Sequence, residues 1–282
     1  MKGRRDGKFR YKDCAVLYRT NAQSRLFEEK FLMANVPCKI VGGVNFYARK
    51  EIKDLLCYLK TIDNARDDLA VKRILNVPKR GIGATSENRV QDYADKMNIS
   101  FYEALRVAEE IPSMGRATGK ISDFVEFIQS LKSKAEAYTV RELLEEVVEL
   151  TGYVKDLEAE NTEEAQARIE NIREFMGAVT EFEQKSEDKS LFAFLENVAL
   201  VTELDNQDSA PSFVTMMTLH SAKGLEYDAV FMSGMEEGIF PSARAMQEDN
   251  RVEEERRLCY VGVTRARKLL HLSYARRRML FN

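Results

Sequence analysis

The densest group of side chains suited to ligand binding lies in the segment 218–226, Thr-Leu-His-Ser-Ala-Lys-Gly-Leu-Glu. His220 and Lys223 are of types that contact phosphate groups, and Glu226 can accept hydrogen bonds from the hydroxyls of a sugar. In the sequence, Gly224 lies between Lys223, which suits a phosphate, and Glu226, which suits a sugar. An ordinary loop with an exposed histidine and a Lys–Glu ion pair would have the same residues, so the segment alone leaves both interpretations open.

A second segment of interest is 253–266, Glu-Glu-Glu-Arg-Arg-Leu-Cys-Tyr-Val-Gly-Val-Thr-Arg-Ala. Loosely helical spacing of its apolar residues and its leading acidic residues predict a helix, because carboxylates are favoured at a helix N-terminus. Arg256 and Arg257 fit surface salt bridges. Arg265 follows Gly262 near the predicted helix end, where its guanidinium can reach a phosphate with two parallel hydrogen bonds.

The segment 18–25, Tyr-Arg-Thr-Asn-Ala-Gln-Ser-Arg, directly follows a short apolar run at 14–18 that predicts a buried strand. Open α/β sheets bind ligands at the carboxyl ends of their strands, and the polar residues here suit phosphate or sugar contacts. We therefore expect Arg19 and Arg25 to contact a nucleic acid. The alternative is a turn that starts a helix, with Ser24 as its cap.

Two glycines mark the segment 77–86, Val-Pro-Lys-Arg-Gly-Ile-Gly-Ala-Thr-Ser. A plain turn between helices needs only one glycine, whereas two allow a close backbone approach to a ligand. Thr85 or Ser86 is predicted to cap the next helix, whose free amides favour an anion. The pattern is typical of a turn that holds a duplex backbone without reading its sequence. The residues that we expect to take part are Lys79, Arg80, Gly81, Gly83 and Thr85.

Two other kinds of site are excluded. The segment 115–122, Gly-Arg-Ala-Thr-Gly-Lys-Ile-Ser, is one residue too short for a phosphate-binding P-loop, and Ile121 stands where Ser or Thr is required. It also has no predicted strand before it. With only two histidines and no acidic–histidine cluster, the sequence predicts no metal site.

The elements that must position these residues change in kind along the chain. Short apolar runs at both ends predict strands at 14–18, 39–42, 213–219, 229–232 and 269–273, whereas residues from about 49 to 203 have helical periodicity. An end piece of about 40 residues is too small to form a core alone. We therefore expect one α/β domain with a parallel sheet assembled from both ends, 1–42 and 210–282, and an all-helical insertion over 43–209.

Charge is distributed unevenly over the 282 residues, although the net charge is only −3. Residues 1–60 have a net charge of +8 and residues 241–282 of +5, whereas residues 134–208 have −13. Basic ends suit a nucleic-acid partner. The sequence has no apolar run of about 20 residues and no secretory signal, which predicts no membrane segment. Four dispersed cysteines without a CxxC pair suit a reducing compartment, so we expect a cytoplasmic protein.

Four ordered motifs in the chain resemble the C-terminal half of superfamily 1 DNA helicases of the UvrD/Rep/PcrA type, most of all the PcrA branch. The segment 15–25 is similar to motif IVa of that family, 218–226 to motif V and 253–266 to motif VI. The segments 41–43 and 46–54 resemble the start of the domain called 2B. The resemblance covers nearly the whole chain.

This resemblance implies a fold and a set of roles. The chain ends would form the second RecA-like domain, 2A, of P-loop NTPase type, and the helical middle would be the inserted 2B domain. Arg265 would reach the γ-phosphate of ATP, with Gly224 and Glu226 in the nucleotide site and Glu226 on the ribose. His220 and Lys223 would contact single-stranded DNA, the 79–85 turn would hold duplex, and Phe281 would be the aromatic wedge at the duplex junction. Departures are small: Tyr227 replaces Phe and Cys259 replaces Ala.

The family's Walker A, Walker B and Asn-Tyr-Arg-Ser motifs have no counterpart in the sequence. The resemblance therefore implies a fragment that lacks the first RecA-like domain and its Mg²⁺ and phosphate cradle. The expected function is ATP-dependent 3′–5′ DNA unwinding and translocation in repair or replication, with ATP and Mg²⁺ as cofactors and repair or replication proteins as partners. Alone, the fragment would be inactive. The alternatives are a stand-alone module that binds duplex DNA or a protein, and a subunit of a helicase–nuclease.

Overall fold

The computed structural model describes residues 9–205, 212–247 and 249–276. The chain divides into two compact units. Among the described residues, the sheet unit consists of 9–49 together with those from 200 to 276, and the helical unit consists of 50–199. The sequence placed the two boundaries at 42/43 and 209/210.

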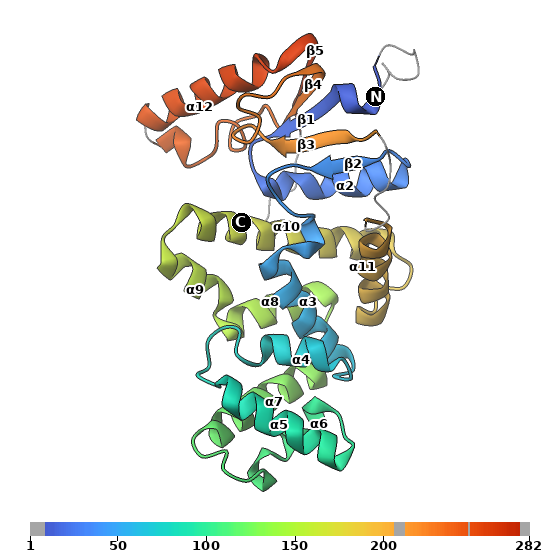
Figure 1. The fold of residues 1–282 in the computed structure, drawn as a ribbon, viewed down its shortest axis with the longest axis vertical. Helices are drawn as coiled ribbons and strands as arrows, with labels where there is room; N and C mark the ends of the chain where they lie inside the picture. The colour runs from blue at the N-terminus through green and yellow to red at the C-terminus, as the bar shows by residue number, and fades with distance from the viewer. Residues whose placement is uncertain (1–8, 206–211, 248, 277–282) are drawn as a thin grey trace. The chain divides into compact units, whose positions relative to one another are not determined.

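In the described part of the sheet unit, five parallel strands lie in the order β2-β3-β1-β4-β5 (Figure 1). The mixed α/β class with a parallel sheet is therefore confirmed. Each strand overlaps one of the apolar runs that predicted it, and the run at 14–18 coincides with β1. The strands are β1 (Cys14–Tyr18), β2 (Cys38–Ile40), β3 (Val214–Thr218), β4 (Tyr227–Ser233) and β5 (Ala266–Ser273).

The two faces of β1 pack against different helices, because successive side chains of a strand point to opposite sides. Ala15 and Leu17 belong to a core that includes Leu258 of α12 (Asp249–Val263). Val16 and Tyr18 belong to a second core that includes Phe27 of α2 (Ser24–Met33). Figure 1 shows α12 and α2 beside the sheet. All five residues of β1 are buried, which is typical of a central parallel strand.

A polar network joins α2 to the 3₁₀ turn at Phe46–Ala48. The Ser24 hydroxyl donates to Glu28 at 2.5 Å and accepts from Arg49 at 2.6 Å. Glu28 also accepts from the Phe46 amide at 2.9 Å, and its burial raises the pKa of its carboxyl. The predicted cap role of Ser24 is therefore wrong: Gln23 is the N-cap residue, and the Ser24 side chain belongs to this network.

The helical unit is built from amphipathic helices that bury apolar residues at helical spacing, such as Leu55 and Leu59. Ser100 and Thr139 cap their helices by accepting from the amides three residues ahead. The helices are α3 (Lys50–Asp63), α4 (Asp68–Leu75), α5 (Ala84–Met97), α6 (Phe101–Arg106), α7 (Ala117–Lys134), α8 (Val140–Thr151), α9 (Tyr153–Glu160), α10 (Glu163–Lys185) and α11 (Leu191–Asp205). The 199/200 division between the units falls within α11.

Gly262 allows α12 to approach the sheet closely. A Cβ atom at this position would lie 2.4 Å from Cδ2 of Leu219 and 2.8 Å from Cε of Met232. Any larger residue must therefore displace core side chains or the helix.

We expect Gly262→Ala to destabilise the sheet unit. Overpacking costs about 1–3 kcal/mol, and the helix propensity of alanine returns about 1 kcal/mol of that. Gly119→Ala is the matched control, because Gly119 also lies in a helix and nothing lies within 4 Å of an added Cβ there. Calorimetric unfolding should show a lower midpoint for Gly262→Ala and an unchanged or higher one for Gly119→Ala. Equal unfolding midpoints for the two variants would contradict the close packing of α12 against the sheet.

Candidate functional site

The residues predicted to bind nucleotide meet at the amino edge of the sheet. Glu226 directly precedes β4 and Arg265 directly precedes β5. Because β4 and β5 pair in parallel, with Tyr227 opposite Ala266, the two residues lie at the same edge. The Tyr227 amide donates to the Arg265 carbonyl at 2.9 Å.

The guanidinium of Arg265 contacts the turn that contains Gly224 and Glu226. Its Nη1 donates to the Leu225 carbonyl at 3.0 Å, and its Nε donates to the Val261 carbonyl at 2.9 Å. Its Nη2 donates to Thr264 Oγ1 at 2.9 Å. A guanidinium has five N–H donors, so Arg265 keeps donors for an anion while its orientation is set by the last turn of α12.

The carboxylate of Glu226 is accessible to a ligand. It accepts from Arg267 Nε at 2.9 Å, and the two side chains are 50% and 60% exposed. Ion pairs with this exposure contribute about 0–1 kcal/mol, so a ligand hydroxyl can replace Arg267 at little cost. Gly224 has a φ of +85° and nothing within 4 Å of an added Cβ, so the turn is open beside it. Arg267 was not identified from the sequence.

Of the residues predicted to contact single-stranded DNA, His220 lies at the opposite, carboxyl edge, whereas Lys223 lies in the 222–225 turn that leads away from this edge, in which the Leu225 amide donates to the Ala222 carbonyl at 3.1 Å. Tyr18 and Thr218 pair at the ends of β1 and β3, and the Leu219 amide donates to the Tyr18 carbonyl at 2.9 Å. His220 and Lys223 follow in the turn after β3, and both are exposed. The edge therefore offers an accessible imidazole side chain next to the end of β1.

Arg19 and Arg25, at the same edge, are engaged in ion pairs. Arg19 Nη2 donates to Glu255 Oε1 at 2.7 Å, and its Nε lies 2.9 and 3.1 Å from the two carboxylate oxygens. Arg25 is only 4% exposed and donates to both oxygens of Glu29, at 2.9 and 3.0 Å. Sequence reasoning missed Glu255 and Glu29, although Glu29 stands one helical turn after Arg25.

Arg80 supports the 77–86 turn from inside. Its Nη1 donates to the carbonyls of Ile74 at 2.8 Å and of Val77 at 3.3 Å. Its Nη2 donates to Tyr58 Oη at 2.5 Å, and the guanidinium lies 5.2 Å from the centre of the Phe124 ring. Burial raises the pKa of Tyr58, so its hydroxyl is neutral. Arg80 thus holds the shape of the turn with most of its donors.

The outer part of the turn presents its backbone and cations. Gly81 has a φ of +72°, a conformation that strongly favours glycine, and Gly81, Gly83 and Thr85 are exposed, as is Lys79. Gly83 is the N-cap residue of α5, so the prediction that Thr85 or Ser86 caps this helix is wrong. Thr85 instead lies in its first turn. Glycine is an accepted N-cap, and it leaves the free amides uncovered.

Lys120 of α7 adds a third positive charge to this turn, after Lys79 and Arg80. Its Nζ donates to the Gly81 carbonyl at 3.1 Å, from a position 39 residues away in the sequence. The segment 115–122 thus contributes to the candidate duplex-binding turn, and it is preceded by a turn rather than a strand, which agrees with its exclusion as a P-loop. No local pattern in the sequence relates Lys120 to Gly81.

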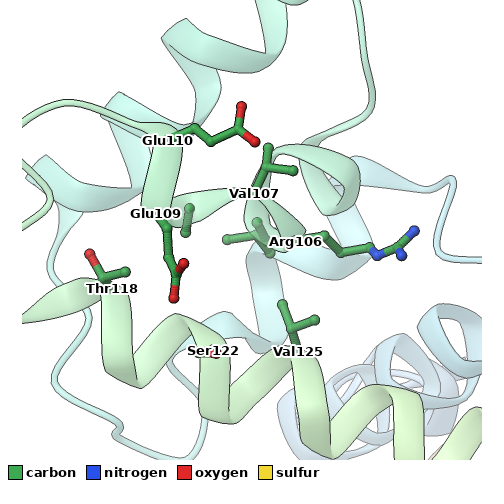
Figure 2. Close-up of a pocket in the computed structure, with 9 residues that line it drawn as sticks. Arg106, Val107, Glu109, Glu110, Thr118, Ser122 and Val125 are labelled. Atoms are coloured by element: carbon green, nitrogen blue, oxygen red, sulfur yellow. The ribbon is translucent and has the colours of Figure 1, made fainter.

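A small pocket of about 170 Å³ lies elsewhere in the helical unit. Figure 2 shows Glu109 directed toward α7, with Thr118 and Ser122 on that helix. Pockets for drug-sized ligands usually have about 300–1,000 Å³. This pocket therefore does not suit a nucleotide, and none of the predicted site residues lines it.

Three further expectations concern ligands and surroundings. Phe281, the predicted wedge, lies outside the described residues. Within the described ranges no group of three His, Cys, Asp or Glu residues could hold a metal ion. In the same ranges no helix has both the length and the apolar character to cross a bilayer.

Comparison with known proteins assigns the chain to a family. The profile of the UvrD-like helicase C-terminal domain matches residues 2–277. Two similar relatives are both described as ATP-dependent DNA helicase PcrA. The one from Staphylococcus aureus is 48% identical over 100% of this chain and 39% of the relative. The one from Bacillus subtilis is 46% identical over 98% of this chain and 38% of the relative. The chain thus spans about two fifths of these relatives' length, and it belongs to the UvrD-like helicase C-terminal domain family.

Proposed function

We propose that the chain is the C-terminal portion of an ATP-dependent 3′–5′ DNA helicase, which couples ATP hydrolysis to movement along single-stranded DNA and to duplex unwinding in repair or replication. The relatives' shared description, ATP-dependent DNA helicase, supports this function over a stand-alone binding module or a helicase–nuclease subunit. The sheet unit would be the second RecA-like domain and the helical unit the inserted 2B domain. The protein would act in the cytoplasm.

The contact between Arg265 and the 224–226 turn carries the proposal. It places a guanidinium with free donors beside an open glycine turn and an accessible carboxylate. Arg265 would neutralise charge that develops on the transferred phosphoryl group, which is the role of an arginine finger. Glu226 would orient the ribose. ATP with Mg²⁺ supplies the phosphoryl group, and the Mg²⁺ ligands would come from a first RecA-like domain outside this chain.

DNA would contact both units through exposed groups. His220 would bind single-stranded DNA at the carboxyl edge of the sheet, and Lys223 would bind it from the turn that follows. Arg19 and Arg25 would support the binding surface. Lys79 and the Gly81–Gly83 backbone would hold duplex phosphates, with Thr85 and Arg80 beside them. Such contacts give affinity without sequence specificity. Phe281 would stack on the last base pair of the junction.

We expect Arg265→Ala to abolish ATP hydrolysis in the intact helicase while binding of single-stranded DNA stays within about threefold. Loss of an arginine finger lowers kcat by about 10³–10⁵-fold. Arg244→Ala is the matched control, since Arg244 is an exposed arginine of the same unit. Steady-state ATPase and DNA anisotropy assays, with melting curves to verify folding, measure both effects. Retained hydrolysis by Arg265→Ala would refute the proposed site.

Lys79→Ala should weaken binding of blunt duplex DNA by the 282-residue chain and make it less dependent on salt. Each lost phosphate contact lowers the slope of log K against log salt by about 0.9. Lys96→Ala is the control, because Lys96 is an exposed lysine at the opposite end of α5 from Gly83. Titrations at several salt concentrations should separate the two variants. Equal slopes for them would contradict a duplex contact at the turn.

A further inference from the structure

The helix α12 connects the two edges of the sheet. Glu255 lies in its first half, next to Arg19 at the carboxyl end of β1, whereas Arg265 follows its last residue at the amino edge. The eight helical steps from Glu255 to Val263 span about 12 Å. A single rigid element therefore links the edge proposed to bind DNA with the edge proposed to bind ATP.

Arg19 and Glu255 form an ion pair with a fixed mutual orientation. Both carboxylate oxygens of Glu255 accept from the guanidinium, at 2.7 to 3.1 Å, and the side chains are 24% and 8% exposed. Such fork-like pairs fix geometry as well as distance. The backbone next to Arg19 is also held, because Gln23 Oε1 accepts from the Arg19 amide at 2.9 Å and the Thr20 amide at 3.0 Å.

The other end of α12 is fixed by packing. Gly262 lies against Leu219, whose amide bonds to the last residue of β1, and against Met232 of β4. The Arg265 guanidinium in turn donates to Val261 in the last turn of the helix. Packing and hydrogen bonds thus form a continuous set of contacts from the ends of β1 and β3, through α12, to Arg265.

We propose that Arg19 and Glu255 are positioning residues that couple occupancy of the DNA edge to the placement of Arg265 through α12. The inference rests on the proposed function, and it gives Arg19 a role distinct from a direct DNA contact. The pair would hold α12 in the register that lets Arg265 reach phosphate. Without it, DNA would still bind, but binding would no longer be transmitted to hydrolysis.

The test uses the intact helicase with Arg19→Glu, Glu255→Arg, the double exchange of both, and the milder Glu255→Gln. Glu254→Gln is the control, an exposed glutamate next to Glu255. For each variant the measured quantity is the ratio of ATPase rates with and without saturating single-stranded DNA. The Kd for that DNA and the melting midpoint are measured in parallel.

We expect the three single variants at the pair to lower the ratio by about tenfold, within the range of coupling between contacting residues. The double exchange should restore most of the ratio, and the Glu255 variants should leave the Kd for DNA within about threefold. A direct DNA contact would instead raise the Kd in Arg19→Glu alone. A merely structural pair would lower the melting midpoint but leave the ratio of the folded enzyme unchanged.

Either of those two results overturns the proposed coupling. If Glu255→Arg fails to fold, the test rests on Glu255→Gln. An unchanged ratio of ATPase rates in that variant would then overturn the proposed coupling. A wild-type helicase whose hydrolysis is not stimulated by DNA would instead contradict the proposed function itself, and the two failures are therefore distinguishable.

Discussion

The parallel pairing of β1 with β3 on one side and β4 on the other is the constraint on which the sheet unit depends. Ala15 is paired with both Thr215 and Val230, so the centre of the sheet exists only when distant parts of the chain combine. Because all the strands are parallel, every loop after a strand starts at one edge and every loop before a strand ends at the other. The chemistry is thereby divided between two edges: His220 and Arg19 at one, Glu226 and Arg265 at the other.

This division explains why the side chains at the two edges differ in character. At the amino edge, Arg265 is held by backbone carbonyls and Glu226 by an exposed arginine, so both can exchange partners with a ligand. At the carboxyl edge, Arg19 is fixed by a carboxylate on α12, and the side chain of His220 is accessible. The first arrangement suits a ligand that enters and leaves, and the second suits a surface whose shape must persist.

Much of the fold could be predicted from the sequence, because apolar runs and helical periods report burial directly. The run at 14–18 predicted β1 to the residue. What could not be predicted were contacts across long sequence separations: Glu255 with Arg19, and Lys120 with Gly81. No short sequence motif relates the two members of either pair. The N-cap role of Gly83 was not predicted, because Thr and Ser are residue types that commonly cap helices and both stand nearby as Thr85 and Ser86. The backbone of the turn instead starts the helix directly after Gly83.

Hydrogen–deuterium exchange on the intact helicase tests the two-edge arrangement most directly. A non-hydrolysable ATP analogue and single-stranded DNA would be added separately. We expect the analogue to protect amides of 224–227 and 263–266, and DNA to protect those of 19–23 and 219–223. Protection of the same edge by both ligands, or no protection of 263–266 by the analogue, would contradict separate binding edges for ATP and DNA.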